Sequence, residues 1–314
     1  MIHELRAQRD TVHWGYLSRH LPPVLSIESG DEVDVETLSY PRGARIEELL
    51  TPALEDILAT VEQVGTAPHL LTGPIAVRGA RPGDVLAIDV LSVAPALGHA
   101  YNRIMPGARG LGLLPEDFPD AWFGLLPLDR ARREVVFRDD IRIPMRCFFG
   151  IMAVAPPDDG QLTSRVPGAF GGNLDITELT AGARLYLPVF NEGALFSVGD
   201  GHATQGDGEV DIGAAEASMT GRLRFTVLRD RALAQPMVET PASIITVGID
   251  EDLREAVKIA IRAMIDWLAA NHGLTREQAY ALCSLAVDLR VSQVVNGRSG
   301  IHAVLPRAIF TGSP

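Results

Sequence analysis

Residues 199–209 read Gly-Asp-Gly-His-Ala-Thr-Gln-Gly-Asp-Gly-Glu and combine carboxylate, imidazole and amide groups with four glycines. Asp200 and His202 lie two residues apart, as do Asp207 and Glu209. Residues two apart in an extended backbone point to the same face, so Asp200 and His202 can reach one metal ion or one substrate. The glycines leave room for a close approach and permit positive φ where the chain turns.

The chemistry of this segment depends on which of its groups act together. An Asp/His pair favours a borderline cation such as zinc, whereas the carboxylates alone would favour calcium. Gly-Asp and Asp-Gly pairs are also common in hairpin loops, so a purely structural turn is the alternative. Because such a turn does not require His, Gln and Glu between its glycines, we expect a functional site here.

Other polar residues elsewhere in the chain are weaker candidates when each is taken alone. His69 lies in Pro-His-Leu-Leu-Thr-Gly-Pro, where a turn or surface histidine is the simpler interpretation. Asn173 and Asp175 follow a Gly-Gly pair and share one face, although an Asx turn would look the same. Glu216 stands among small residues, and burial there would raise its pKa toward that of a general acid or base.

Composition narrows the class of protein. The 314 residues are 46% hydrophobic, which supports a large core and argues against global disorder. The net charge of -12 would repel nucleic acid and anionic membranes, so we expect neither as a partner. We expect Cys147 and Cys283 to be buried thiols. The sequence shows no secretory signal and no apolar stretch long enough to span a bilayer, which favours the cytoplasm.

Most of the first 250 residues are predicted to form strands and turns. Apolar or alternating segments predict strands at residues 84–91, 184–190, 195–198 and 221–228. Residues 98–120 are rich in Gly and Pro and predict a long loop, a kind of segment that is often a functional lid. The sequence contains no nucleotide-binding glycine motif and no Gly-X-Ser-X-Gly nucleophile motif.

The C-terminal part has helical periodicity. Residues 251–272 predict a helix with Asp250 as a possible N-cap and Gly273 just past its end. A capping box at residues 275–278 predicts a second helix that runs through Ala286. Asp288 and Arg290 are interpreted as a local ion pair.

These patterns predict a mostly β, α+β fold, because no βαβ alternation is present. We expect one domain over residues 1–314. Its β-rich part would cover residues 1–249, and a helical hairpin segment over residues 250–290 would pack on it.

Several segments together resemble the acetamidase/formamidase family of amide hydrolases. The most specific match runs from Leu187-Pro188-Val189-Phe190 through Gly199-Asp200-Gly201-His202 to Gln205-Gly206-Asp207-Gly208-Glu209. Weaker matches follow a consistent order along most of the chain: residues 13–15, 22–24, 29–31, 69–74, 79–84, 171–175 and 284–290. Two positions depart from the family pattern, because Phe170 stands where some formamidases carry His and residues 147–150 stand where some carry Pro-His.

The resemblance implies a β-sandwich-like body, a homodimer or higher homo-oligomer, and a divalent metal, zinc or calcium. It also implies hydrolysis of the C–N bond of a small amide such as formamide or acetamide, with release of ammonia. The two departures bear on which amide is the substrate.

A metal-assisted amidase is the first mechanistic hypothesis. Asp200 and His202 would bind a divalent metal, zinc above calcium, with His69 as a third ligand and an open position for water. Glu209 or Glu216 would act as the general base and return the proton to the leaving nitrogen. The predicted substrate-binding and supporting residues are Asn173, Asp175 and Gln205.

Two other hypotheses remain open at this point. The glycine-acid segment could hold a structural calcium ion in a non-enzymatic small-ligand module, although His202 argues against calcium. The same site could instead hydrolyse a lactam or another cyclic amide, with His99, Tyr101 and Arg103 of the predicted 98–120 loop shaping its pocket.

Overall fold

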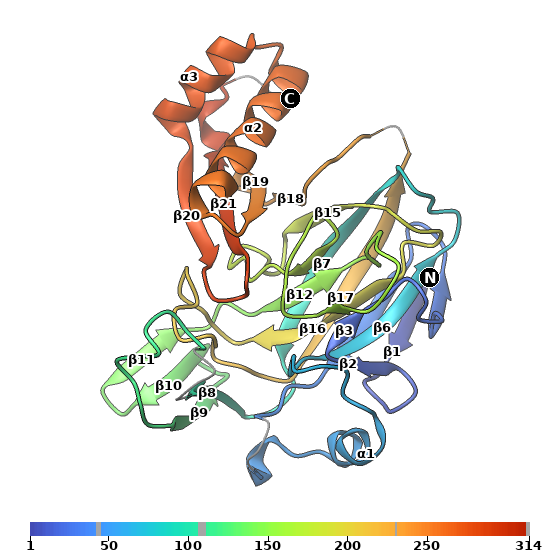
Figure 1. The fold of residues 1–314 in the computed structure, drawn as a ribbon, viewed down its shortest axis with the longest axis vertical. Coiled ribbons are helices and arrows are strands. Elements are labelled where there is room, and N and C mark those ends of the chain that lie inside the picture. Colours follow the sequence, from blue (N-terminus) through green and yellow to red (C-terminus); the bar gives the residue numbers. More distant parts are fainter. Residues whose placement is uncertain (42–44, 106–110, 230, 312–314) are drawn as a thin grey trace.

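Two large β-sheets form the body of the protein, shown as a computed structural model in Figure 1. The structure describes residues 1–41, 45–105, 111–229 and 231–311. The larger sheet has nine strands and is mostly antiparallel, with β1 and β5 parallel. In spatial order, its strands are β1 (Ile2–Leu5), β5 (Glu32–Thr37), β17 (Met219–Leu228), β7 (Val85–Pro95), β15 (Arg184–Pro188), β18 (Met237–Glu239), β19 (Ser243–Asp250), β21 (Ser299–Pro306) and β20 (Asp288–Gln293).

A six-stranded sheet packs against the larger one. Its strands are β14 (Gly171–Asn173), β12 (Phe148–Ala153), β16 (Phe196–His202), β6 (Leu70–Val77) and β2 (Val12–Trp14), with β4 (Leu25–Ile27) paired to β6. Phe196 of β16 meets Phe225 of β17 edge to face, with ring centroids 5.1 Å apart. Buried side chains of both sheets, such as Leu71 and Val33, belong to one hydrophobic cluster. This packing confirms the predicted mostly β fold with a β-sandwich-like body.

Smaller elements surround the sandwich. A four-stranded sheet contains β11 (Ile141–Pro144), β10 (Glu134–Arg138), β9 (Trp122–Asp129) and β8 (His99–Ile104). The remaining elements are the paired strands β13 (Leu162–Thr163) and β3 (Tyr16–Leu17), helix α1 (Pro52–Thr60) and the 3-10 turns η1 (Glu47–Leu49) and η2 (Arg307–Ile309).

β8 corrects the predicted loop over residues 98–120. Residues 99–104 are extended and pair with β9, because cross-strand hydrogen bonds supply the order that their weak apolar pattern did not reveal. Residues 106–110 of that predicted loop lie outside the described residues. The four predicted strands are present as β7, β15, β16 and β17, and β16 extends beyond its predicted end to include His202.

Two helices near the C-terminus form the predicted helical hairpin, α2 (Leu253–His272) and α3 (Arg276–Ala286). Asp252, and not Asp250, caps α2, because Asp250 still belongs to β19 and the cap must directly precede the first helical residue. Gly273 lies just past the end of α2 as predicted, in a left-handed conformation, and the predicted capping box opens α3. No helix among the described residues is long and apolar enough to cross a membrane.

Helix α2 lies directly on β19 and β21, at the end of the nine-stranded sheet (Figure 1). A Cβ added at Gly248 of β19 would lie 1.9 Å from the carbonyl oxygen of Ala256, so glycine permits this close approach. The same hydrogen-bonded sheet runs from the sandwich into the helical part. That continuity supports the single domain predicted for residues 1–314, which stays a prediction.

His13 is a buried histidine that belongs to the sandwich. The residue is 6% exposed, and its Nε2 lies 3.0 Å from Ser197 Oγ. Its ring makes a T-shaped contact with the ring of Tyr16. Burial lowers the pKa of His13 from 6.5 to about 4, although the backbone of Tyr16 opposes the shift. The imidazole is therefore neutral in the folded protein over most of the acidic range.

Replacing His13 should reduce the acid sensitivity of the fold. Between pH 6.5 and 4 the unfolded chain binds a proton at His13 that the folded protein rejects, so stability falls as pH falls. In His13→Gln, the loss of unfolding free energy between pH 7 and pH 4.5 should be smaller by about 2 kcal/mol. Urea unfolding at both pH values measures this, with His20→Gln as a surface control. An equal loss in wild type and His13→Gln would contradict the assignment.

Candidate active site

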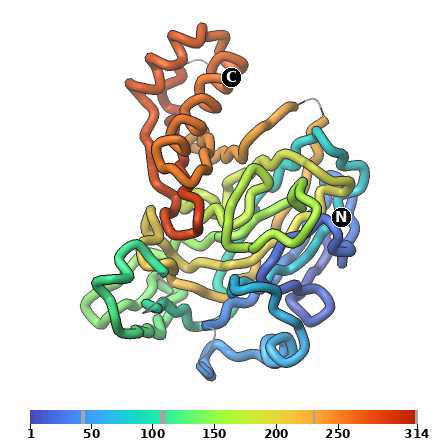
Figure 2. The backbone as a smooth tube through the Cα atoms, in the orientation of Figure 1, coloured from blue at the N-terminus to red at the C-terminus, as the bar shows by residue number. Residues whose placement is uncertain are grey.

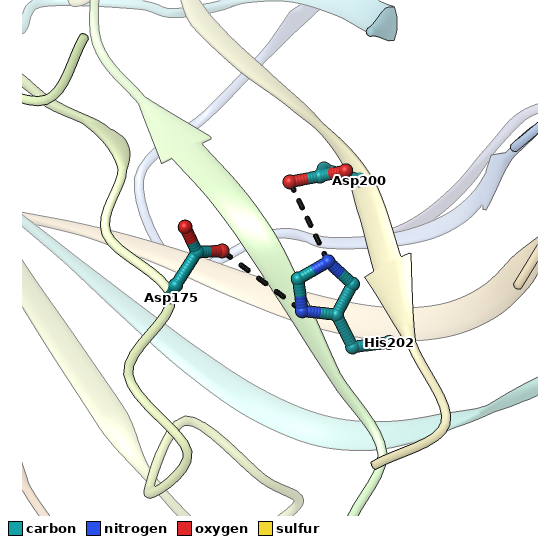
Figure 3. A group of neighbouring side chains, drawn as sticks. All are labelled: Asp175, Asp200 and His202. Carbon is teal, nitrogen blue, oxygen red and sulfur yellow. Dashed lines mark ion pairs between the residues drawn. The ribbon is translucent and has the colours of Figure 1, made fainter. Parts of the chain in front are cut away.

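β16 presents Asp200 and His202 at its C-terminal end, between β12 and β6. The side chains face each other as their spacing predicted, with Asp200 Oδ2 3.5 Å from His202 Nε2 (Figure 3). Phe148 of β12 packs edge-on against the imidazole, with ring centroids 5.0 Å apart. His202 is fully buried, and its strand β16 pairs with β12, where Phe148 lies opposite His202.

Gln205 fixes the tautomer of His202. The Gln205 amide nitrogen donates to the carbonyl oxygens of Asp175 at 3.1 Å and Ser292 at 3.2 Å, so its Oε1 is the acceptor. His202 Nδ1 lies 2.9 Å from that oxygen and therefore donates to it. In the neutral ring, Nε2 then carries a lone pair, and this buried atom has no hydrogen-bond partner in the described structure.

Glu216 approaches the same nitrogen from the other side. Its Oε1 lies 3.3 Å from His202 Nε2, and Asp200 Oδ2 lies 3.5 Å from the same nitrogen. Backbone bridges from Glu216 to Tyr101 of β8 and to His202 hold the segment in place, and the Ala214 N–H donates to Glu216 Oε1 at 3.0 Å. The free nitrogen of His202 thus faces two carboxylates.

A second pair of carboxyl groups, Asp175 and Glu209, lies beside the first. The Asn296 side-chain amide donates to Asp175 Oδ2 at 2.6 Å and to Glu209 Oε2 at 3.4 Å. Asn296 belongs to the turn between β20 and β21, which reaches back from the C-terminal part onto the loop after β16 (Figure 2). Sequence analysis missed this residue, because its Asn-Gly pair looks like an ordinary turn.

The buried ionisable groups of the site shift one another's pKa values. Burial and the neighbouring charge of Asp175 raise the pKa of Glu209, and burial also raises the pKa of Asp175. Burial would lower the pKa of His202, but Glu216 and Asp200 outweigh it and raise that pKa. Burial opposes ionisation of Asp200, yet His69 and His202 lower its pKa to about 2. The site is strongly negative and favours a bound cation.

Three of the four carboxylate residues adopt left-handed backbone conformations. Their φ values are 51° at Asp175, 56° at Asp200 and 47° at Glu209. This region is unfavourable for residues other than glycine, at a cost of roughly 1 kcal/mol each. Such conformations concentrate where a side chain must be aimed at a functional site.

Gly150 of β12 forms the floor under these groups. A Cβ there would lie 2.5 Å from Asp175 Oδ1 and 2.8 Å from Asp200 Oδ2. It would also lie 2.9 Å from the His202 ring. Only glycine leaves this space to the carboxylates and the imidazole.

The donor atoms fit a divalent metal. Two sets of ligand atoms lie within 4.8 Å of one another: Asp175 with Asp200 and His202, and His202 with Glu209 and Glu216. One imidazole nitrogen with several carboxylate oxygens suits zinc better than calcium, which prefers oxygen alone. The lone-pair nitrogen of His202, which lacks a protein partner, is the donor that such an ion requires.

His69, the predicted third ligand, lies just outside both sets. Its Nε2 is 4.0 Å from Asp200 Oδ1, and its Nδ1 is 2.9 Å from Ser164 Oγ. Burial lowers the pKa of His69, although Asp200 and Glu216 oppose the shift. The structure therefore places His69 beside Asp200 Oδ1, whereas His202 Nε2 faces Asp200 Oδ2.

A cavity of about 880 Å³ opens onto the site. Among the predicted residues, its lining includes His69, Asn173, Asp200, Glu209 and Glu216. Asn173 is buried, and its Oδ1 has no hydrogen-bond partner among the described residues.

Two other predicted residues, Gln205 and Asp175, lie behind the residues that line the cavity. Gln205 orients His202, and Asp175 is fully buried next to Glu209. Neither is among the described residues that line the cavity. Both therefore support the groups that face the cavity.

Arg290 stabilises the glycine-rich segment and corrects its predicted pairing with Asp288. Its Nε donates to Asp207 Oδ2 at 2.7 Å, and its guanidinium also pairs with Glu178. Thr177 Oγ1 donates to Asp207 at 3.0 Å. Asp207 thus anchors the loop to the C-terminal strands, because the fold brings two distant carboxylates, Asp207 and Glu178, within reach of Arg290.

Comparison with known proteins gives a consistent result. A model of the acetamidase/formamidase family matches residues 3–166 and 161–312. The chain is 28% identical over 277 residues to an acetamidase of Mycolicibacterium smegmatis, a match that covers 67% of this chain. The match covers 65% of the acetamidase, so this chain spans less than two thirds of the length of that curated relative.

Solved structures share the fold over nearly the whole chain. A predicted acetamidase/formamidase from Thermoanaerobacter tengcongensis superposes with a TM-score of 0.85 at 30% identity, over 98% of this chain and 97% of that one. An acetamidase from Bacillus halodurans gives a TM-score of 0.85 at 31% identity, over 98% of both chains.

Gly150→Ala should weaken zinc binding without unfolding the protein. The added methyl group displaces Asp175 and Asp200, so we expect zinc affinity to fall by about 10-fold or more. Competition with a chromophoric chelator measures this affinity. Gly206→Ala is the matched control, because a Cβ there meets nothing within 4 Å. Equal zinc affinity in Gly150→Ala and wild type would contradict the assigned site.

Proposed function

Because the chain belongs to the acetamidase/formamidase family, we propose that it hydrolyses the C–N bond of a small linear amide. Water and the amide would give a carboxylate and ammonia. The observation that carries this proposal is the unpartnered Nε2 of the buried His202, which lies between Asp200 and Glu216. Asp200, Glu216 and the neighbouring Glu209 all line the cavity.

A divalent metal fits the donor set of this site. We propose that His202 and Asp200 hold it, as their spacing predicted, with Glu216 as the nearest further donor. His69 stays a predicted ligand from the other side of Asp200. When bound, zinc would supply Lewis acidity toward water and the amide carbonyl. A structural calcium ion in a binding module is the alternative, and the imidazole donor argues against it.

The Asp175–Glu209 pair is suited to move protons. Two buried carboxyl groups with raised pKa values share a proton, so one is ionised while the other is protonated. The ionised member accepts the proton of the attacking water, and a proton reaches the amide nitrogen as the C–N bond breaks. Both predicted bases line the cavity, but Glu209 belongs to this pair, whereas Glu216 faces His202.

Asn173 is suited to orient the substrate. Its unpartnered Oδ1 can accept a hydrogen bond from the amide N–H₂ of a substrate in the cavity. A lactam or other cyclic amide would bring one N–H to the same acceptor and stays the second candidate substrate. The homo-oligomeric state and the cytoplasmic location stay predictions.

Amide hydrolysis and its metal dependence can be tested together. Ammonia release from short linear amides should stop after chelator treatment and return with zinc. A panel that adds lactams distinguishes the two substrate classes. Absence of release from every amide by zinc-loaded protein would favour the structural-metal alternative and contradict the proposal.

Replacing Glu209 and replacing Glu216 should have different effects on kcat and on zinc affinity. Glu209→Gln should lower kcat by about 100-fold or more and keep zinc, because it removes a proton carrier. Glu216→Gln should reduce zinc affinity, because it removes a donor next to His202 Nε2. Exposed Glu192→Gln is the control for both variants. The roles would be reversed if Glu216→Gln kept full zinc affinity and Glu209→Gln lost it.

A further inference from the structure

Arg165 places a guanidinium on the wall of the cavity that makes no direct ion pair with any described residue. Its side chain is half-buried and lines the cavity with Arg103. Only its backbone N–H has a hydrogen bond, to Thr163 Oγ1, and its guanidinium has no ion pair with any residue that the structure describes. Burial and the nearby charge of Arg103 lower the pKa of Arg165, although the charges of Asp200 and Glu209 oppose the shift. A partly desolvated guanidinium without a partner is costly unless a ligand supplies one.

The backbone connects Arg165 to the groups of the candidate site. The preceding residue, Ser164, is 2.9 Å from His69 Nδ1 through its hydroxyl group. His69 Nε2 in turn lies 4.0 Å from Asp200 Oδ1. Arg165, His69 and Asp200 all line the same cavity, so a ligand that meets Arg165 can extend toward Asp200.

The cavity is larger than the smallest amides require. Its volume of about 880 Å³ lies in the range of sites that enclose much larger ligands than formamide or acetamide. The described walls also include Tyr101 and Leu38, so an aliphatic chain between two polar ends would find apolar contact.

We propose that Arg165 binds a carboxylate at the far end of the substrate, which is then a half-amide of a dicarboxylic acid. This inference rests on the proposed amidase function. Water adds to the amide carbon, the C–N bond breaks, and ammonia and a dicarboxylate leave while the Arg165-bound carboxylate is unchanged. The planar guanidinium matches a carboxylate with two parallel hydrogen bonds, and the charge of Arg103 strengthens the attraction.

Matched substrates test this assignment. We would compare kcat/KM for half-amides of dicarboxylic acids and for uncharged aliphatic amides of equal chain length. Wild type should prefer the half-amide by about 10-fold or more. Arg165→Gln should lose about 10- to 100-fold on the half-amide, mainly through KM, and less than about 2-fold on the uncharged amide. Arg165→Lys should retain part of the preference, and exposed Arg142→Gln should retain all of it.

Two outcomes would overturn the proposal: a wild type that prefers the uncharged amide, or an Arg165→Gln loss that is equal for both substrates. If neither substrate is hydrolysed, the amidase function itself fails, and calorimetric titration with succinate decides the carboxylate site separately. Succinate binding that weakens in Arg165→Gln would support the site. Binding that is absent, or the same in both proteins, would overturn it.

Discussion

The hydrogen bond from His202 Nδ1 to Gln205 Oε1 determines what this site can do. It leaves the other imidazole nitrogen, aimed between Asp200 and Glu216, to carry either a proton or, as a lone-pair donor, a bound cation. Gln205 can only accept this bond because its amide nitrogen is already committed to the carbonyls of Asp175 and Ser292. The tautomer of one histidine therefore depends on backbone groups from two distant parts of the chain.

The C-terminal strands are consequently part of the site. Ser292 contributes its carbonyl to Gln205, Arg290 holds Asp207, and Asn296 donates to Asp175 and Glu209. Burying several carboxylates in one place is unfavourable unless hydrogen bonds and cations compensate. The β20–β21 hairpin supplies two of these compensating groups, Arg290 and Asn296. The C-terminal part of the fold is thereby linked directly to the site.

Local patterns in the sequence predicted local structure well. The period-2 spacing of Asp200 and His202 brought both to one side of β16, and the capping box correctly placed the start of α3. The role of Asn296 was not predictable, because its contacts span 121 and 87 residues of chain. The unpartnered state of Arg165 was equally hidden, since a missing partner is a property of the folded surroundings and leaves no mark on residue spacing.

The strained backbone supports the functional role proposed for the carboxylates of this site. Asp175, Asp200 and Glu209 occupy φ values that glycine adopts without cost, and each pays roughly 1 kcal/mol to do so. Glycine at these positions would relieve that strain and also remove a buried charge, so stability alone favours it. The chain does use glycine at the neighbouring left-handed position, Gly208, with φ 99°. A carboxylate kept where glycine would be more stable is one whose charge the site requires.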